Sequence, residues 1–478
     1  MEDDMLRILY RAGVVLVAVL ALPLVIGVSR ATSYQRTLYE PAADTSVPAP
    51  ARDLRPPPHD PGKPTVVVLV GNHGANVGDV LGPYETFAVT GAVNLYTVAP
   101  ERRLVPLTGG LDLLPDLSFA ELEERLAGAA PDVVAVPQMP RAEPATTAPV
   151  NAWLSRQAGA GALVLGVCIG AEVLASAGLL DGRDATSHWF RLGDLEERYP
   201  AVRWQRATRY VDDGTVITTG AVLSGIDGAL RVVERLLGER TAAAAAAAVG
   251  WAHYRPGAPA PLPGSTFGPR DTIAGVNLTF RPRPDIGVVL TDGAGEIELA
   301  SLFGTYTEAA YAGRLVALGM DAALPVRSRH GLVFVPRGGL SAMPDLDRLL
   351  VPGANAAVRH RAALDARARE LGGPAPEYPH AEPGFAFDLA LRDMARTIDV
   401  PTARWRAKTL EYPASGLSGL AGPGWPWGAT MLPLLYGLLG LLAAGAVRVV
   451  VRRARPDVNT SGTVGDRTIR PRAQRARR

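Results

Sequence analysis

The sequence of 478 residues has few of the side chains that bind metals or form cross-links. It contains one cysteine, Cys168, and seven histidines, none of which forms a His-x-x-x-His pair at helical spacing. A single cysteine excludes an internal disulfide framework and any zinc site built on cysteines. We therefore expect no metal site and no cofactor.

Lysine is also scarce. Only Lys63 and Lys408 are lysines, whereas arginine, alanine, glycine and proline are abundant, which is typical of a high-GC bacterial genome. The net charge of +2 is too small to indicate a nucleic-acid partner. A chain of this length predicts two or three domains, each large enough to bury a core.

A first long apolar stretch, residues 12–29, contains no charged residue and lies between Arg11 and Arg30. At about 1.5 Å per residue, a helix over this stretch just spans a bilayer core. A cleaved signal peptide is the alternative, but no Ala-x-Ala site follows and acidic residues precede the stretch. We predict a retained transmembrane anchor over residues 1–30.

A second apolar stretch, residues 428–447, lies in a region without charged residues. Trp425 and Trp427 precede it, at positions suited to the membrane interface. We predict a transmembrane helix over residues 425–447.

The last residues, 448–478, are strongly basic. One interpretation is a segment that binds nucleic acid or anionic lipid. The favoured one is a positive-inside topology signal, which places the tail in the cytoplasm. Two spans would then put the part of the chain between them on the outer side of a bacterial cell membrane.

Between the two spans the composition changes three times. Residues 31–63 are rich in proline and predict an extended linker. Residues 64–240 alternate between short β-branched runs and helical patterns, including a capping box formed by Ser118 and Glu121. This alternation predicts an α/β domain with a parallel sheet covered on both faces. Residues 241–284 form a connector rich in alanine and proline.

The chain then repeats itself. Residues 286–310 align with residues 67–91 without a gap, so that Glu298 takes the place of Asp79. Weaker matches continue in the same order, and we predict a second lobe over residues 285–412.

One stretch of the first lobe has no counterpart in the second. Residues 161–180 read as a short apolar strand, then Cys168, Ile169 and Gly170, then a helical pattern. The corresponding residues 354–383 of the second lobe are polar, without an apolar strand or a cysteine. The second lobe is therefore predicted to be catalytically degenerate.

A cysteine at such a strand-to-helix turn is a candidate nucleophile. The sharp turn exposes the side chain, and the following backbone N–H groups and helix N-terminus favour a thiolate and a developing oxyanion. This pattern predicts a lowered thiol pKa at Cys168. Gly170 permits the close approach that the turn requires. The alternative is a buried structural cysteine.

These residues resemble a known family. The run GVCIGAEVLASAGLLDGRDATSHW (166–189) is similar to the ThiJ/PfpI family, in particular to isonitrile hydratases and to the sensory domains of AraC-type regulators. Asp79, Gly82, Pro83, Glu85 and Phe87 match a second family motif upstream. The resemblance covers residues 64–240 and, weakly, 285–400. It implies a flavodoxin-like fold of the class I glutamine amidotransferase type.

The resemblance also implies site residues. Cys168 would be the nucleophile, Asp79 the acid near its thiol and His188 the family's histidine, with Glu85 and Thr186 as substrate-binding candidates. Asp79 could instead cap the helix that begins near Val80, and His188 could be a packed histidine on a strand.

Two residues depart from the family pattern. Ile169 follows the cysteine where isonitrile hydratases carry a hydroxyl residue. Gln138 stands where relatives commonly have a glycine whose N–H helps to form the oxyanion hole, so it would reshape that hole.

We therefore expect a membrane-anchored cysteine-dependent hydrolase or hydratase that acts on a small electrophile. A non-catalytic ligand-binding or sensor module, and a structural protein that has lost its site, are the alternatives. Members of the family commonly form dimers, so the two lobes are expected to dock as an internal pseudo-dimer near Cys168.

Overall fold

A computed structural model describes residues 2–141, 143–322, 324–413 and 418–453. The chain divides into two compact units. One is Ile26–Thr430, and the other combines Met1–Val25 with Met431–Arg478. From residue 454 onward, the basic tail on which the cytoplasmic topology prediction depends lies outside the described residues.

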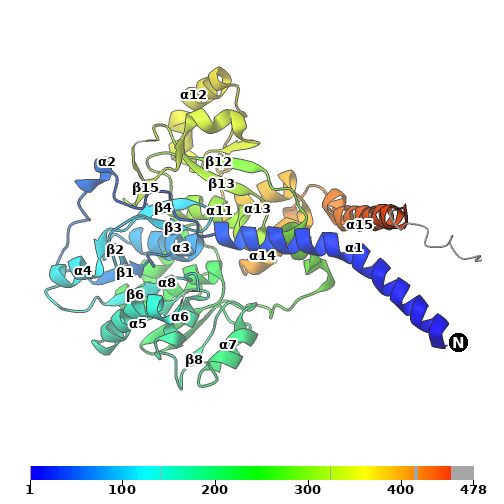
Figure 1. Ribbon diagram of the computed structural model, residues 1–478. Helices are drawn as coiled ribbons and strands as arrows, with labels where there is room; N and C mark the ends of the chain where they lie inside the picture. Colours follow the sequence, from blue (N-terminus) through cyan, green and yellow to red (C-terminus); the bar gives the residue numbers. More distant parts are fainter. Residues whose placement is uncertain (1, 142, 323, 414–417, 454–478) are drawn as a thin grey trace, which may run out of the picture. The chain divides into compact units, whose positions relative to one another are not determined.

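The larger unit contains a seven-stranded sheet in the order β10-β11-β7-β6-β1-β2-β5. Three of its strands, β6, β1 and β2, are labelled in Figure 1. All neighbouring strands are parallel except β10 and β11. The strands are β1 (Thr65–Leu69), β2 (Asn94–Ala99), β5 (Leu117–Ser118), β6 (Val133–Val136), β7 (Leu163–Gly166), β10 (Tyr210–Asp213) and β11 (Val216–Thr219). The central strands are apolar and buried because helices cover both faces.

Side-chain alternation along β1 separates the two faces of this sheet. Val66 and Val68 pack in the same core as α3 (Val77–Ala88), α8 (Val222–Leu237) and α9 (Glu239–Ala248). Val67 and Leu69 pack on the other face, in the core that includes side chains of α4 (Phe119–Arg125), α5 (Pro144–Gly159) and α6 (Gly170–Ser176). The predicted flavodoxin-like fold is confirmed. So is the capping box of Ser118 and Glu121, at the start of α4.

After α6 the chain forms a small peripheral section before it returns to the sheet. This section contains the two-stranded sheet of β8 (Asp184–Ala185) and β9 (Arg203–Trp204) and the helix α7 (Leu192–Arg198).

A second sheet, of five parallel strands, has the order β16-β13-β12-β17-β18. Its strands are β12 (Asp285–Leu290), β13 (Arg314–Gly319), β16 (Gly338–Gly339), β17 (Arg348–Leu350) and β18 (Pro376–Glu377). Its helices are α10 (Thr272–Thr279), α11 (Glu296–Tyr306), α12 (Ala354–Leu371), α13 (Ala386–Thr397) and α14 (Val400–Thr409), with short 3-10 turns η1 (Pro269–Asp271), η2 (Glu308–Ala310) and η3 (Leu340–Asp345). Between β17 and β18 the chain forms α12, so this sheet carries no strand–cysteine–helix turn.

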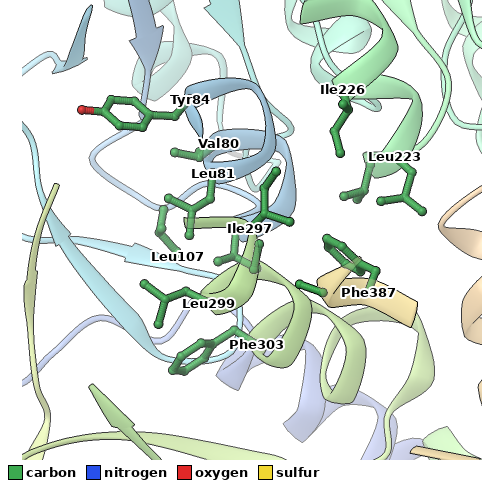
Figure 2. Close-up of a cluster of buried hydrophobic side chains, with 14 of the residues drawn as sticks. Val80, Leu81, Tyr84, Leu107, Leu223, Ile226, Ile297, Leu299, Phe303 and Phe387 are labelled. Atoms are coloured by element: carbon green, nitrogen blue, oxygen red, sulfur yellow. The ribbon is translucent and has the colours of Figure 1, made fainter. Parts of the chain in front are cut away.

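The two sheets are joined by a shared hairpin layer and by helix packing. One four-stranded antiparallel sheet contains β3 (Val105–Leu107) and β4 (Leu111–Leu114) from the first half and β14 (Val326–Arg327) and β15 (Val333–Val335) from the second. The two halves meet where β4 pairs with β15. Helix α3 packs on α11, and α11 on α13. Figure 2 shows side chains from both halves in this core, among them Leu81 on α3, Ile297 and Phe303 on α11, and Phe387 on α13. Each such side chain contributes about 1.5–3 kcal/mol when fully buried.

Two helices are long and apolar enough to cross a membrane. They are α1 (Glu2–Thr37), in which an 18-residue window within Leu9–Thr37 has a mean hydropathy of 2.6, and α15 (Trp427–Arg453), in which such a window within Trp427–Val451 reaches 2.1. Within the smaller unit the two helices touch at small residues, since a Cβ atom at Gly440 would lie 2.0 Å from the Ala18 carbonyl oxygen.

Helix α1 continues into the predicted linker as far as Thr37, and a single helical turn, α2 (Ala49–Arg52), follows. The linker is therefore partly helical.

Candidate active site

Cys168 lies in the sharp turn between β7 and α6. Its backbone has a positive φ of 57°, and its side chain is only 2 % exposed. The turn lies directly on the end of β6, because the Val167 N–H donates to the Val136 carbonyl at 2.9 Å. A Cβ atom at Gly170 would be 2.1 Å from that same oxygen, so only glycine fits there.

Two hydroxyl groups hold the backbone of Cys168. The Cys168 N–H donates to Thr219 Oγ1 at 3.1 Å, and the Cys168 carbonyl accepts from Ser187 Oγ at 2.9 Å. Sequence reasoning missed both residues. Ser187 lies in the matched Ala-Thr-Ser-His-Trp segment, which could have indicated it, whereas Thr219 ends β11 without a motif.

Asp79 is fully buried in the first turn of α3. Its Oδ2 atom accepts the Gln138 N–H at 3.0 Å, and its Oδ1 atom has no hydrogen-bond partner among the described residues. The helix-cap alternative is wrong, because Asn76 caps α3 and accepts the N–H groups of Gly78 and Asp79. Burial raises the pKa of Asp79 well above its usual value, and Glu308 raises it further.

The pKa of the Cys168 thiol is shifted in the direction opposite to the one that the turn alone predicts. Burial, then Asp79, then Glu411 and Glu308 raise its pKa well above the usual value, against a weaker opposing effect of the Ile169 N–H. The prediction of a lowered pKa is wrong, because the thiol is shielded from water and faces carboxyl groups instead of cations.

The carboxyl group of Glu308 comes from the second half of the chain. It accepts Thr108 Oγ1 at 2.9 Å and pairs with Arg406 at 2.5 Å, and both side chains of the ion pair are buried. Arg406 lies on α14. No motif identified either residue, because only tertiary packing places them near the first sheet.

Glu411 is also buried, just beyond α14. Its Oε2 atom accepts the Ala221 N–H at 2.7 Å and the Ser224 hydroxyl at 2.5 Å, at the start of α8. A Cβ atom at Gly220 would lie 2.2 Å from this oxygen, so the carboxyl group lies directly against the turn after β11.

Tyr39, from the predicted linker, reaches the same site. Its hydroxyl is buried without a hydrogen-bond partner among the described residues. Burial raises the pKa of Tyr39, and Glu308, Asp79 and Cys168 raise it further, so its phenol lies among the groups of the site. A Cβ atom at Gly74 would be 2.6 Å from the Tyr39 ring, which fixes the ring against the loop after β1.

Both ring nitrogens of His188 form hydrogen bonds with backbone groups. Its Nε2 atom lies 2.8 Å from the Thr409 carbonyl, and its Nδ1 atom accepts the Phe190 N–H at 3.2 Å. Burial lowers the pKa of His188 to about 4, so the ring is neutral at neutral pH and donates from Nε2. Neither nitrogen is free to take a proton from Cys168.

Glu85 and Thr186 also make contacts away from the thiol. Thr186 donates its N–H to Thr218 Oγ1 and its hydroxyl to the Gln205 carbonyl, both at 2.8 Å. Glu85 accepts the Ile297 N–H of α11 at 2.6 Å and pairs with Arg329 at 3.2 Å.

Glu85 belongs to a buried cluster between the two halves. Its carboxyl group lies within 4.8 Å of the ligand atoms of Glu296 and His330, which are themselves 2.7 Å apart. Burial and Glu296 raise the pKa of Glu85 to about 7. Glu296 and His330 bind each other, whereas Glu85 accepts the Ile297 N–H, so the cluster joins α3 to α11.

Ile169 follows Cys168 in the turn, and Gln138 contacts Asp79. The Gln138 N–H is the group that holds Asp79, and its carbonyl accepts the Asn76 N–H at 2.9 Å. Ile169 lines a neighbouring cavity of about 740 Å³, together with Gly74 and Met139. Cys168 does not line this cavity.

Comparison with known proteins gives the chain its family. Residues 64–235 match the DJ-1/PfpI family. An isonitrile hydratase from Pseudomonas putida is 34% identical over 167 residues, which are 34% of this chain and 68% of that protein. The HTH-type transcriptional regulator GlxA from Rhizobium meliloti is 36% identical over 94 residues, and the match spans only 29% of that regulator.

Comparison with solved structures also gives matches over part of the chain. A ThiJ/PfpI family protein from Pseudomonas syringae is 25% identical with a TM-score of 0.36, over 43% of this chain and 85% of that one. Drosophila melanogaster DJ-1beta is 19% identical with a TM-score of 0.33, over 39% of this chain and 97% of that one. With the isonitrile hydratase match over two thirds of that relative, the chain belongs to the DJ-1/PfpI family.

Proposed function

We propose that this protein is a cysteine-dependent hydrolase or hydratase that adds its thiol to a small uncharged electrophile. The observation that carries the proposal is the electrostatic influence of the buried Asp79 carboxyl group on the Cys168 thiol, together with its Oδ1 atom, which has no partner among the described residues. A carboxyl group with an unoccupied oxygen beside a thiol can take and return its proton. The surrounding carboxyl groups of Glu308 and Glu411 disfavour an anionic substrate.

The residues support a balanced two-step reaction. In the first step Sγ bonds to the electrophilic carbon while the thiol proton passes through Asp79 to the substrate. In the second step water adds to that carbon, the S–C bond breaks, and the thiol regains a proton. His188 takes no part in proton transfer, because backbone groups hold both of its ring nitrogens.

The isonitrile hydratase relative suggests a probe for this chemistry. Addition of water to an alkyl isonitrile gives an N-alkylformamide, which can be measured directly. Ile169 supplies no hydroxyl beside the thiol, so we expect slow turnover of this probe.

A ligand-binding or sensor module is the second candidate. The closure of the site favours it, because the thiol is 2 % exposed and its pKa is raised. The matches to HTH-type regulators point the same way. In this role the site around Cys168 would bind a small molecule without converting it to a product.

The second lobe fits a duplicated, degenerate copy of the first. Strands β16-β13-β12-β17-β18 follow the order of β5-β2-β1-β6-β7, and α11 packs on α3 as the second copy of that helix. Glu308 and Arg406 from this lobe face the thiol site. Together these features support an internal pseudo-dimer that buries Cys168.

The membrane proposal rests on α1 and α15. With both helices retained in a bacterial membrane, the two lobes would lie on the outer side and the tail in the cytoplasm. Labelling of single cysteines introduced at exposed position Ser33 and in the tail, in intact cells of a Cys168→Ser background, tests this sidedness. Labelling of the tail from outside would contradict it.

The decisive experiment follows the full chain in a mild detergent. Wild type, Cys168→Ala and Asp79→Asn are incubated with a small alkyl isonitrile, and the formamide is quantified. The wild type should form product and both variants should lose it. Alkylation of Cys168 should meanwhile shift to lower pH in Asp79→Asn, because the carboxylate that raises the thiol pKa is gone.

The two readouts separate the candidates. Loss of turnover together with easier ionisation of the thiol requires Asp79 as a proton-transfer group. Binding of the probe without product, equal in wild type and Cys168→Ala, establishes the sensor role instead.

A further inference from the structure

A second cavity, of about 810 Å³, is not lined by Cys168, although Glu411 lies on its wall. It is enclosed by the connector between the lobes, by α14 and by the chain just before α15. Its walls include connector residues from Ala252 to Asp271, α14 residues from Pro401 to Lys408, and Gly424 and Trp425.

Positive charge collects on these walls. Five basic side chains line the cavity: Arg209, Arg255, Arg270, Arg404 and Lys408. The two carboxyl groups on the walls are already engaged. Asp271 pairs with Lys408 at 2.5 Å, and Glu411 is held by the Ala221 N–H and the Ser224 hydroxyl. His253 also lines the cavity, and burial lowers its pKa, so it adds no charge at neutral pH.

Three of the arginines have no partner. Arg255, Arg270 and Arg404 are exposed, and their side chains form no hydrogen bond or ion pair within the described part of the chain. Guanidinium groups bind phosphate and carboxylate through paired N–H donors. Three unpaired groups around one cavity therefore favour an anion.

Arg209 gives an independent indication. It lines the cavity although its side chain is only 2 % exposed. One terminal nitrogen lies 3.4 Å from Asp227 and the other donates to the Glu411 carbonyl at 3.3 Å, but its Nε–H is buried without a partner among the described residues. Arg209 is therefore a buried cation with an incomplete set of hydrogen bonds at the wall of the cavity.

The remaining walls are aromatic and apolar. Tyr254, Trp405, Tyr412 and Trp425 face the same space, and Trp425 stands two residues before α15 in the sequence. An inorganic anion would leave these surfaces unused, whereas a ligand with an apolar body would cover them.

We infer that this cavity binds an amphiphile with an anionic head group, a phosphate or a carboxylate, and an apolar body that packs on the aromatic walls. An anionic phospholipid has this chemistry, as does a soluble phosphate ester. The inference goes beyond the proposed function and does not depend on Cys168.

The test uses the full chain in a neutral detergent, with bound ligand counted by native mass spectrometry. The probes are a six-carbon phosphatidylglycerol, the matching phosphatidylcholine, an alkyl phosphate ester and inorganic phosphate. The variant is Arg255→Gln/Arg404→Gln, since both side chains are exposed and unpaired and their loss should not affect folding. The matched control is Arg55→Gln/Arg240→Gln, at two exposed positions outside the cavity whose side chains form no hydrogen bond or ion pair within the described residues.

We expect phosphatidylglycerol to bind at least about tenfold more tightly than phosphatidylcholine, and the cavity variant to lose about tenfold while the control stays within about twofold. If the soluble phosphate ester binds as tightly as phosphatidylglycerol or more tightly, and the cavity variant loses affinity for it to the same degree, the anion site is supported and its ligand is a soluble one. If inorganic phosphate binds as tightly as the amphiphiles, the inference that the ligand has an apolar body is overturned. Binding that the cavity variant leaves unchanged, or no preference for the anionic lipid, would overturn the inference.

Discussion

Replacement of Tyr39 by alanine should open the site at Cys168. Tyr39 is half-buried, and its ring lies against Gly74 with its hydroxyl among Asp79, Cys168 and Glu308. Labelling of a buried thiol proceeds through local opening, so its rate scales with the open population. Half-burial of an aromatic side chain contributes about 1–2 kcal/mol, which corresponds to about a 5–30-fold change in that population.

The assay is the rate of iodoacetamide labelling of Cys168 in the full chain in detergent, followed by mass spectrometry. The labelling rate should rise about 5–30-fold in Tyr39→Ala. Tyr39→Phe should label within about twofold of wild type, because it keeps the ring and removes only a hydroxyl that has no partner among the described residues.

Tyr378→Ala provides the matched control for general loosening, because Tyr378 is a half-buried tyrosine that packs on Arg361 beside α12. If Tyr39→Ala labels no faster than Tyr378→Ala, the phenol does not cover the thiol and the reasoning fails.

Three further predictions concern the same site. Gly170→Ala should destabilise the larger unit by about 1–3 kcal/mol, because the new Cβ meets the Val136 carbonyl at 2.1 Å; denaturant unfolding followed by tryptophan fluorescence measures this, and an unchanged midpoint would contradict it. His188 has a pKa lowered from 6.5 to about 4, so the folded state loses stability as the pH falls through this window, and His188→Gln should flatten the pH dependence of the thermal midpoint between pH 6.5 and 4. A slope that the variant leaves intact would show that His188 does not titrate as described. Ile169→Thr places a hydroxyl beside the thiol and should raise formamide production from an alkyl isonitrile, whereas Ile169→Val should not; equal rates would exclude a role for this position.

Much of the fold could be predicted from local patterns. Short β-branched runs between helical patterns predict a parallel sheet, and the seven-stranded sheet confirms this for the first lobe. The turn at Cys168 could be predicted because its determinants are adjacent in sequence: an apolar strand, the cysteine, and Gly170 where no side chain fits.

The candidate site was less predictable. The roles expected for Glu85, Thr186 and His188 came from matched motifs. In the structure, all three side chains form hydrogen bonds with groups other than the thiol. The thiol pKa was mistaken because a local pattern contains the turn and the helix end but not the carboxyl groups that surround them.

The sequence by itself determined the family, the two apolar terminal helices and the position of the nucleophile candidate, because each depends on neighbouring residues and their spacing. Only the tertiary structure decided the chemical character of that position. Tyr39 from the segment after α1, and Glu308 and Glu411 from the second half, interact electrostatically with Cys168 although each lies more than 100 positions from it in the sequence. Burial and charge are sums over all neighbours in space, so the order of residues along the chain could not reveal that the thiol is covered and protonated.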